Sequence, residues 1–148
     1  MTSVNESTPA ESTTAPRSIR VSGFTRVLIA VYGILAIAAT GRSFYQILTK
    51  FEVAPVAYTL SAVAAVIYIV ATIALIAPGR AWFRIAVVAI GIELLGVLVV
   101  GAISIAQPEL FPADTVWSQF GRGYGFVPLV LPILGLWSLF RSAKAARS

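Results

Sequence analysis

The stretch from Ile85 to Ala106 constrains the fold more than any other, because it is almost entirely apolar and contains one charged residue, Glu93. At about 1.5 Å per residue, a helix over this stretch is about 33 Å long, enough to cross a bilayer core of about 30 Å. Glu93 would then lie deep in hydrocarbon. A carboxyl group there must be neutral, hydrogen-bonded, paired with a basic residue or in contact with water, because an isolated charge is costly in an apolar medium.

The composition indicates that lipid surrounds most of the chain. Of its 148 residues, 58% are hydrophobic and 11% are charged, and the mean hydropathy is +0.89. Soluble domains carry roughly 25% charged residues. We therefore predict an all-α, polytopic membrane protein. Its parts are a disordered cytoplasmic tail (1–22), four transmembrane helices (about 24–48, 56–77, 82–106 and 123–141) and a basic cytoplasmic tail (142–148).

The positions of the basic residues predict the membrane topology of the chain. Of the 11 Lys and Arg residues, eight lie on one side of the predicted topology and three lie on or near the other. Cytoplasmic loops and tails carry the excess of Lys and Arg in membrane proteins. We therefore expect both termini in the cytoplasm. The basic residues stand at the ends of apolar runs, which is typical of membrane anchoring and argues against nucleic-acid binding.

The residue types that are missing exclude several kinds of chemistry. The chain has no Cys and no His, which removes thiol nucleophiles, disulfides and the usual zinc sites. It also has no paired intramembrane carboxylates, no Ser with a plausible base and no Gly-rich phosphate loop after a strand. We expect no enzyme activity, no catalytic residues, no metal site and no cofactor.

The depth of each residue in the membrane, counted from the cytoplasmic end of its predicted helix, predicts an intramembrane polar site. Glu93, Tyr68 and Pro132 all lie about 12–13 Å deep, and Tyr32 lies about one turn nearer the cytoplasm. We expect Tyr68 to donate a hydrogen bond to the carboxyl group, and a carbonyl freed by Pro132 to accept one from it. Arg42 lies about 10 Å further out, so direct pairing with Glu93 needs helix tilt or a water. Glu93 then either fixes helix packing or serves as a protonatable site.

Small residues recur along the second predicted helix. Ala57, Ser61 and Ala65 stand four residues apart, so they share one face of a helix. Such a face lets a neighbouring helix approach closely, and we expect it to serve helix packing.

The loop 107–125 is the only substantial one in the predicted topology. We expect a short helix over 112–120 whose apolar face, including Trp117, rests on the lipid headgroups. In one interpretation the aromatic residues form a belt that anchors the loop. In the other they form a binding cap made of Trp117, Arg122 and Tyr124.

The last quarter of the chain carries a family resemblance. Residues 110–118 read LFPADTVWS, and residues 120–132 read FGRGYGFVPLVLP. These runs resemble a signature of small, uncharacterised four-helix integral membrane proteins of actinobacteria. The resemblance implies the plasma membrane and a special role for the loop and the helix with two prolines, and it implies no substrate.

Two functional hypotheses follow. The first is a non-enzymatic accessory or interaction subunit of a membrane assembly, whose partners besides the bilayer are other membrane proteins or further copies of the chain. The alternative is a small oligomeric transporter or channel that uses Glu93 as a protonatable site.

Overall fold

The computed structural model describes residues 23–147, and these form helices joined by short turns, with no strand among them. The long helices are α1 (Gly23–Lys50), α2 (Pro55–Ile76), α3 (Arg80–Ala106) and α4 (Val127–Arg147). Between them lie the short 3₁₀ segments η1 (Phe51–Val53), η2 (Pro108–Leu110) and η3 (Ser118–Tyr124). The predicted tail 1–22 lies outside the described residues. The region predicted as a basic tail from 142 onward instead continues α4 as far as Arg147.

The four long helices are each long and apolar enough to cross a membrane. The predicted all-α bundle of four helices is therefore confirmed, and it is compatible with an integral membrane protein. The helix α4 begins four residues later than predicted. Gly125 and Phe126 have φ of +63° and +61°, and this left-handed backbone cannot continue a right-handed helix.

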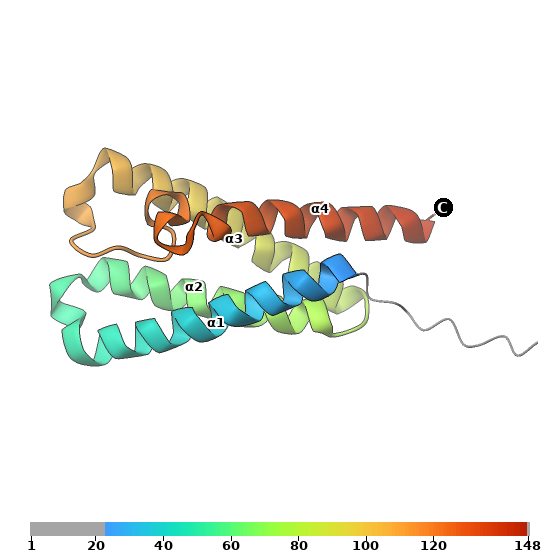
Figure 1. Ribbon diagram of the computed structural model, residues 1–148, viewed down its shortest axis with the longest axis horizontal. Helices are drawn as coiled ribbons and strands as arrows, with labels where there is room; N and C mark the ends of the chain where they lie inside the picture. Colours follow the sequence, from blue (N-terminus) through green and yellow to red (C-terminus); the bar gives the residue numbers. More distant parts are fainter. Residues whose placement is uncertain (1–22, 148) are drawn as a thin grey trace, which may run out of the picture.

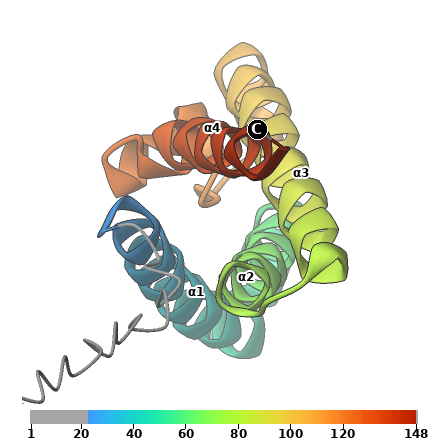
Figure 2. The same ribbon diagram turned by 90° about the vertical axis from the view of Figure 1, so that its right-hand side faces the viewer.

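The helices form two antiparallel hairpins (Figure 1). Figure 2 shows them around a common centre in the order α1, α2, α3, α4. Gly23, Arg80 and the end of α4 lie at one end of the bundle, which we call the terminal end. The opposite end, with Lys50 and Gln107, is called the loop end.

The most extensive contact between two helices is the one between α1 and α2. The predicted small-residue face of α2 is buried in the bundle, with Ala57 and Ser61 fully covered and Ala65 nearly so. The buried residues of α1 also include small ones, among them Ala36 and Ala39. Lipid does not drive apolar helices together, so close approach through small side chains supplies much of the packing energy.

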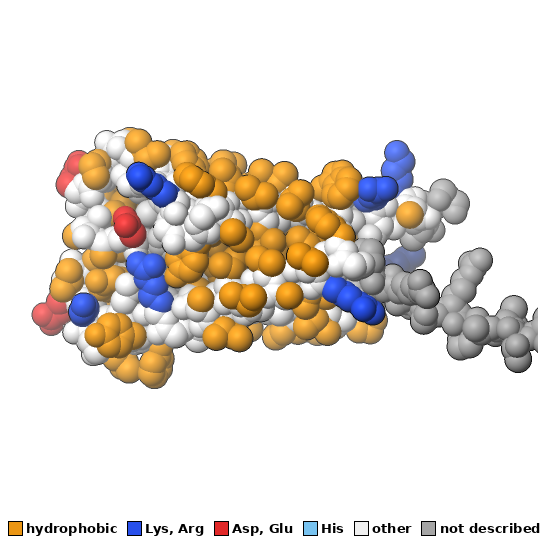
Figure 3. Space-filling model, in the orientation of Figure 1, with side chains coloured by type: hydrophobic (Ala, Val, Ile, Leu, Met, Phe, Trp, Pro, Cys, Tyr) orange, Lys and Arg blue, Asp and Glu red, His pale blue; other side chains and the backbone are white. Residues whose placement is uncertain are grey.

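The surface of the bundle carries an apolar band between two charged ends (Figure 3). Large hydrophobic side chains are exposed along all four helices, as on Ile37 of α1, which is 77% exposed. Apart from Glu93, the acidic residues of the described chain are Glu52, Glu109 and Asp114, and all three belong to the loop end. The charged side chains visible at the terminal end in this view are all basic. This is the distribution of a chain whose middle lies in hydrocarbon.

The chain makes an unusual turn before α4. Gln119, Phe120 and Gly121 have φ of +51°, +61° and +81° in succession. A side chain in this left-handed region costs about 1–2 kcal/mol relative to glycine. Gly121 also has no space for a side chain, because a Cβ there would lie 2.8 Å from Cδ of Pro128.

We predict that Gly121→Ala lowers the free energy of unfolding by about 1–3 kcal/mol, because the methyl group meets both the backbone strain and the Pro128 ring. The measurement is unfolding in mixed micelles, followed by circular dichroism. Gly123→Ala is the matched control, since a Cβ at Gly123 has open space and its φ is not left-handed. Equal losses in the two variants would show that the contact with Pro128 is unimportant.

Candidate functional site

The segment between α3 and α4 enters the bundle instead of lying across its end. Trp117 is only 3% exposed and Val116 only 1%. A Cβ on Gly96 of α3 would lie 2.7 Å from the ring of Trp117. Gly96 is about 15 Å from the loop end of α3, at about 1.5 Å per residue. The expected helix over 112–120 on the headgroups is therefore wrong, and the segment 107–126 is re-entrant.

A second glycine of α3 lies under the re-entrant segment. A Cβ on Gly101 would lie 2.6 Å from Cδ1 of Phe120 and 2.9 Å from the backbone nitrogen of the same residue. Gly96 and Gly101 thus leave two places on α3 where aromatic side chains of the segment lie against bare backbone. Without these glycines the segment would have no room between the helices.

The re-entrant segment supplies hydrogen-bond partners for its own backbone. The Thr115 amide donates to Oγ of Ser118 at 2.8 Å, and the Trp117 amide donates to Oγ1 of Thr115 at 3.1 Å. The Gln119 amide donates to Oγ of Ser104 on α3 at 2.8 Å. Backbone polar groups inside a membrane need such partners because water is excluded. These hydrogen bonds offset the free-energy cost of burying the polar backbone groups of the segment.

The Trp117 side chain is bound to the centre of the bundle. Its indole N–H donates to Oη of Tyr68 on α2, at a distance of 3.1 Å between Nε1 and Oη, and Tyr68 is fully buried. Tyr68 therefore pairs with the loop segment, and its expected hydrogen bond to Glu93 is not formed.

Glu93 is fully buried on α3, and its partner is Tyr32 of α1. The Tyr32 hydroxyl donates to Oε2 of Glu93 at 2.7 Å. The same hydroxyl lies close to α4, since a Cβ on Gly135 would be 3.5 Å from it. The rings of Tyr32 and Tyr68 are 6.3 Å apart between centroids. We call Tyr32, Tyr68, Glu93 and Trp117 the central polar cluster.

One oxygen of this cluster has no partner. Oε1 of Glu93 is buried and makes no hydrogen bond with the described residues. If the carboxyl group is ionised, Oε1 is an acceptor without a donor. If it is neutral with the proton on Oε1, a donor lacks an acceptor. Buried polar groups are rarely left unsatisfied, so the unsatisfied oxygen marks Glu93 as a candidate functional residue.

Arg42 does not pair with Glu93. Its Nη2 donates to the backbone carbonyl of Asp114 at 3.2 Å, and its guanidinium lies 5.9 Å from the ring centroid of Tyr124. Arg42 of α1 therefore holds the re-entrant segment at the loop end, where the guanidinium can reach water.

The three residues of the predicted binding cap do not share one surface. Trp117 is inside the bundle, whereas Arg122 is exposed and donates to Oε1 of Gln119 at 3.2 Å. Tyr124 is half-buried beneath Arg42. A cap made of Trp117, Arg122 and Tyr124 is thus excluded as a single outward-facing site.

Pro132 is fully buried in α4, as expected for a residue near the bundle centre. It removes the donor that would have bonded to the Pro128 carbonyl. The hydrogen bond recorded for Glu93 is the one from Tyr32, so the expected bond from Glu93 to a freed carbonyl is not seen. Pro128 stands in the first turn of α4, where an amide has no partner within the helix in any case.

The direction of side chains explains why Tyr32, and not Tyr68, reaches Glu93. Helical side chains tilt toward the N-terminus of their helix. The helices α1 and α3 both start at the terminal end, so Tyr32 and Glu93 tilt the same way and meet. The helix α2 starts at the loop end, so Tyr68 tilts toward Trp117. A depth estimated from Cα positions alone ignores this tilt of the side chains, although the direction of each predicted helix already implies it.

These features define a class of protein: a four-helix bundle of membrane-spanning length with a re-entrant segment and a buried carboxyl group at its centre. Within residues 23–147, no group of three or more Asp and Glu side chains lies close enough to hold a metal ion. No known protein family, curated protein or solved structure matches the chain.

We predict that Gly96→Ala displaces Trp117, because the added methyl group would lie 2.7 Å from its ring. Loss of the bond to Tyr68 should then loosen the segment and speed tryptic cleavage after the exposed Arg122, measured by gel in mild detergent.

Gly91→Ala is the matched control for this prediction. Gly91 lies on the same helix and has open space around its Cβ position, so alanine should stabilise α3 by up to about 1 kcal/mol. The interpretation fails if cleavage after Arg122 is equally fast in the two variants.

Proposed function

We propose that this chain is a multi-pass protein of the plasma membrane and a non-enzymatic accessory or interaction subunit of a membrane assembly. One observation carries the proposal: the interior of the bundle at the loop end is filled by the protein's own re-entrant segment. Thr115, Val116, Trp117 and Ser118 are all less than 5% exposed. Other molecules therefore meet the outer faces of the helices and the exposed ends of the bundle.

The re-entrant segment also gives the bundle a defined shape. Its bonds to Tyr68, Ser104 and Arg42 connect it to α2, α3 and α1. A bundle tied together in this way presents a rigid surface, and a rigid surface loses little entropy when it binds a partner. This property suits a subunit whose work is association.

The charge distribution supports an orientation with both termini in the cytoplasm. The described basic residues of the terminal end are Arg26, Arg80, Arg84, Arg141, Lys144 and Arg147. The described acidic residues outside the bundle core belong to the loop end. The excess of Lys and Arg favours the cytoplasm for the terminal end. The resemblance of residues 110–132 to actinobacterial membrane proteins favours the plasma membrane.

The test is site-specific photo-crosslinking of the full chain in its native membrane. A crosslinker replaces one exposed residue on each helix in turn, at Ile37, Val63, Leu95 and Val130. We expect one stoichiometric product that forms from one or two of these faces and co-purifies in mild detergent. Crosslinks to lipid alone from all four positions, with a monomer after purification, would contradict the subunit proposal.

A second candidate function is favoured by the unpartnered Oε1 of Glu93. A buried carboxyl group that lacks a partner can take up a proton or a small cation, and intramembrane carboxyl groups often serve in proton relays. In this alternative the chain is a small oligomeric transporter or channel. Access to Glu93 would require the re-entrant segment or the α1–α4 side to open, since Glu93 is fully buried.

Glu93→Gln separates the two candidates, because glutamine keeps the shape and the acceptor for Tyr32 but carries no titratable proton. We expect the variant to keep its fold and its crosslinked product. Tyr32→Phe should instead lose about 1–3 kcal/mol in the free energy of unfolding, because it leaves the Glu93 carboxyl group without a donor. Proton uptake into proteoliposomes that is present in the native chain and lost in Glu93→Gln would favour the transporter.

A further inference from the structure

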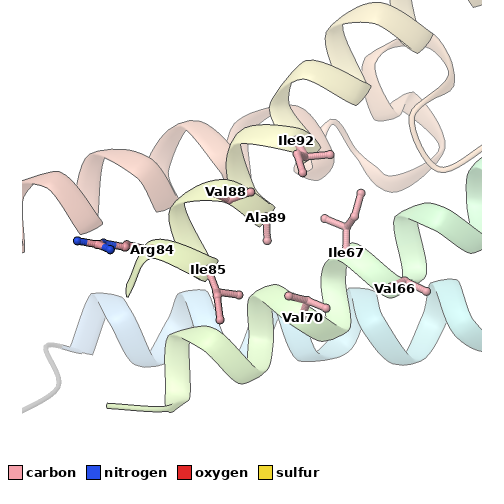
Figure 4. A pocket seen from close by; sticks show the side chains of 8 residues that line it. All are labelled: Val66, Ile67, Val70, Arg84, Ile85, Val88, Ala89 and Ile92. Atoms are coloured by element: carbon pink, nitrogen blue, oxygen red, sulfur yellow. The ribbon is translucent and has the colours of Figure 1, made fainter. Parts of the chain in front are cut away.

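An apolar groove lies on the outer face of the bundle between α2 and α3 (Figure 4). Its volume is about 380 Å³. The small side chain of Ala89 points into it and gives it depth. The residues that form its walls are Val66, Ile67, Val70, Ile85, Val88 and Ile92.

The groove spans most of the hydrocarbon depth of one lipid leaflet. From Arg84 to Ile92 it extends about 12 Å along α3, at about 1.5 Å per residue. Half of a bilayer core is about 15 Å thick. The groove therefore begins near the terminal end and stops close to the middle of the membrane.

The mouth of the groove is basic. Arg84 contributes to its lining, but the guanidinium points away from the apolar walls toward the terminal end (Figure 4). No hydrogen bond or ion pair joins this guanidinium to any residue of the described range 23–147. The nearby start of α3 adds Arg80, and Figure 3 shows basic and no acidic side chains at this end.

We propose that the groove binds an anionic phospholipid, with one acyl chain against the apolar walls and the phosphate on the Arg84 guanidinium. The acyl chain is apolar and ends at the membrane centre, as the groove does. The headgroup carries a negative charge that complements the basic mouth of the groove. Basic pockets between transmembrane helices bind anionic headgroups in this way. The proposal concerns the lipid environment and does not depend on the subunit function.

A transmembrane helix fits this groove less well. A partner helix, or a second copy of the chain, would run the full height of the bundle and needs a contact about 30 Å long. The groove covers only the half near the terminal end. An apolar helix also provides no negative group for Arg84.

The experiment is native mass spectrometry of the purified full chain with phosphatidylglycerol or phosphatidylcholine that carry the same oleoyl chains. We expect phosphatidylglycerol to be retained about fivefold more strongly, the factor that corresponds to one Arg near an anionic headgroup. Arg84→Gln should abolish this preference. Arg26→Gln is the matched control, because Arg26 is an exposed arginine of α1 at the same end and outside the groove.

A second variant tests the apolar part of the site. Val88 is 58% exposed on the wall of the groove, so Val88→Trp can fill the groove without repacking the core. It should lower the retention of both lipids, while circular dichroism shows an unchanged fold. The proposal is overturned by equal retention of the two lipids, by an equal loss of preference in Arg26→Gln, or by a crosslinker at Val88 that joins to protein instead of lipid.

Discussion

The hydrogen bond between the Trp117 indole and the Tyr68 hydroxyl is the interaction on which the rest of the structure depends. Hydrocarbon offers no partner to a polar group, so each one that enters the bundle must find its partner in protein. Trp117 meets this requirement with the hydroxyl of α2 and thereby brings its loop segment into the interior. The two tyrosine rings then lie side by side, and Tyr32 binds Glu93, the acid buried at the centre of the bundle.

The position of Trp117 depends in turn on residues without side chains. Gly96 and Gly101 open two places on α3 for Trp117 and Phe120, and Gly121 lies directly against Pro128. The backbone of Phe120 is left-handed, which costs energy that the packing of the segment has to offset. The filled interior leaves the outer faces of the helices as the surface for association, and the α2–α3 groove is a hollow on that surface with apolar walls and a basic mouth.

The predictions from sequence are correct for those features that a single physical rule determines. The apolar runs predicted four helices because a bilayer core requires about 20 apolar residues in succession, and α2 and α3 lie within two residues of their predicted bounds. Sequence reasoning also placed Glu93 and Tyr68 in the core. It failed for the segment 107–126, where Trp117 was expected among the headgroups. Aromatic residues beside a membrane span usually do lie there, and no local pattern shows that Gly96 has left space for one of them.

The sequence by itself determined that the chain forms four helices long and apolar enough to cross a membrane and that one carboxyl group is buried among them, because these follow from hydropathy summed along a single segment. Only the tertiary structure decided which groups pair. Tyr32 reaches Glu93, Tyr68 reaches Trp117 and Arg42 reaches the Asp114 carbonyl. These pairings depend on the direction in which each side chain tilts from its helix and on the space left by glycines of another helix, which are properties of several segments together.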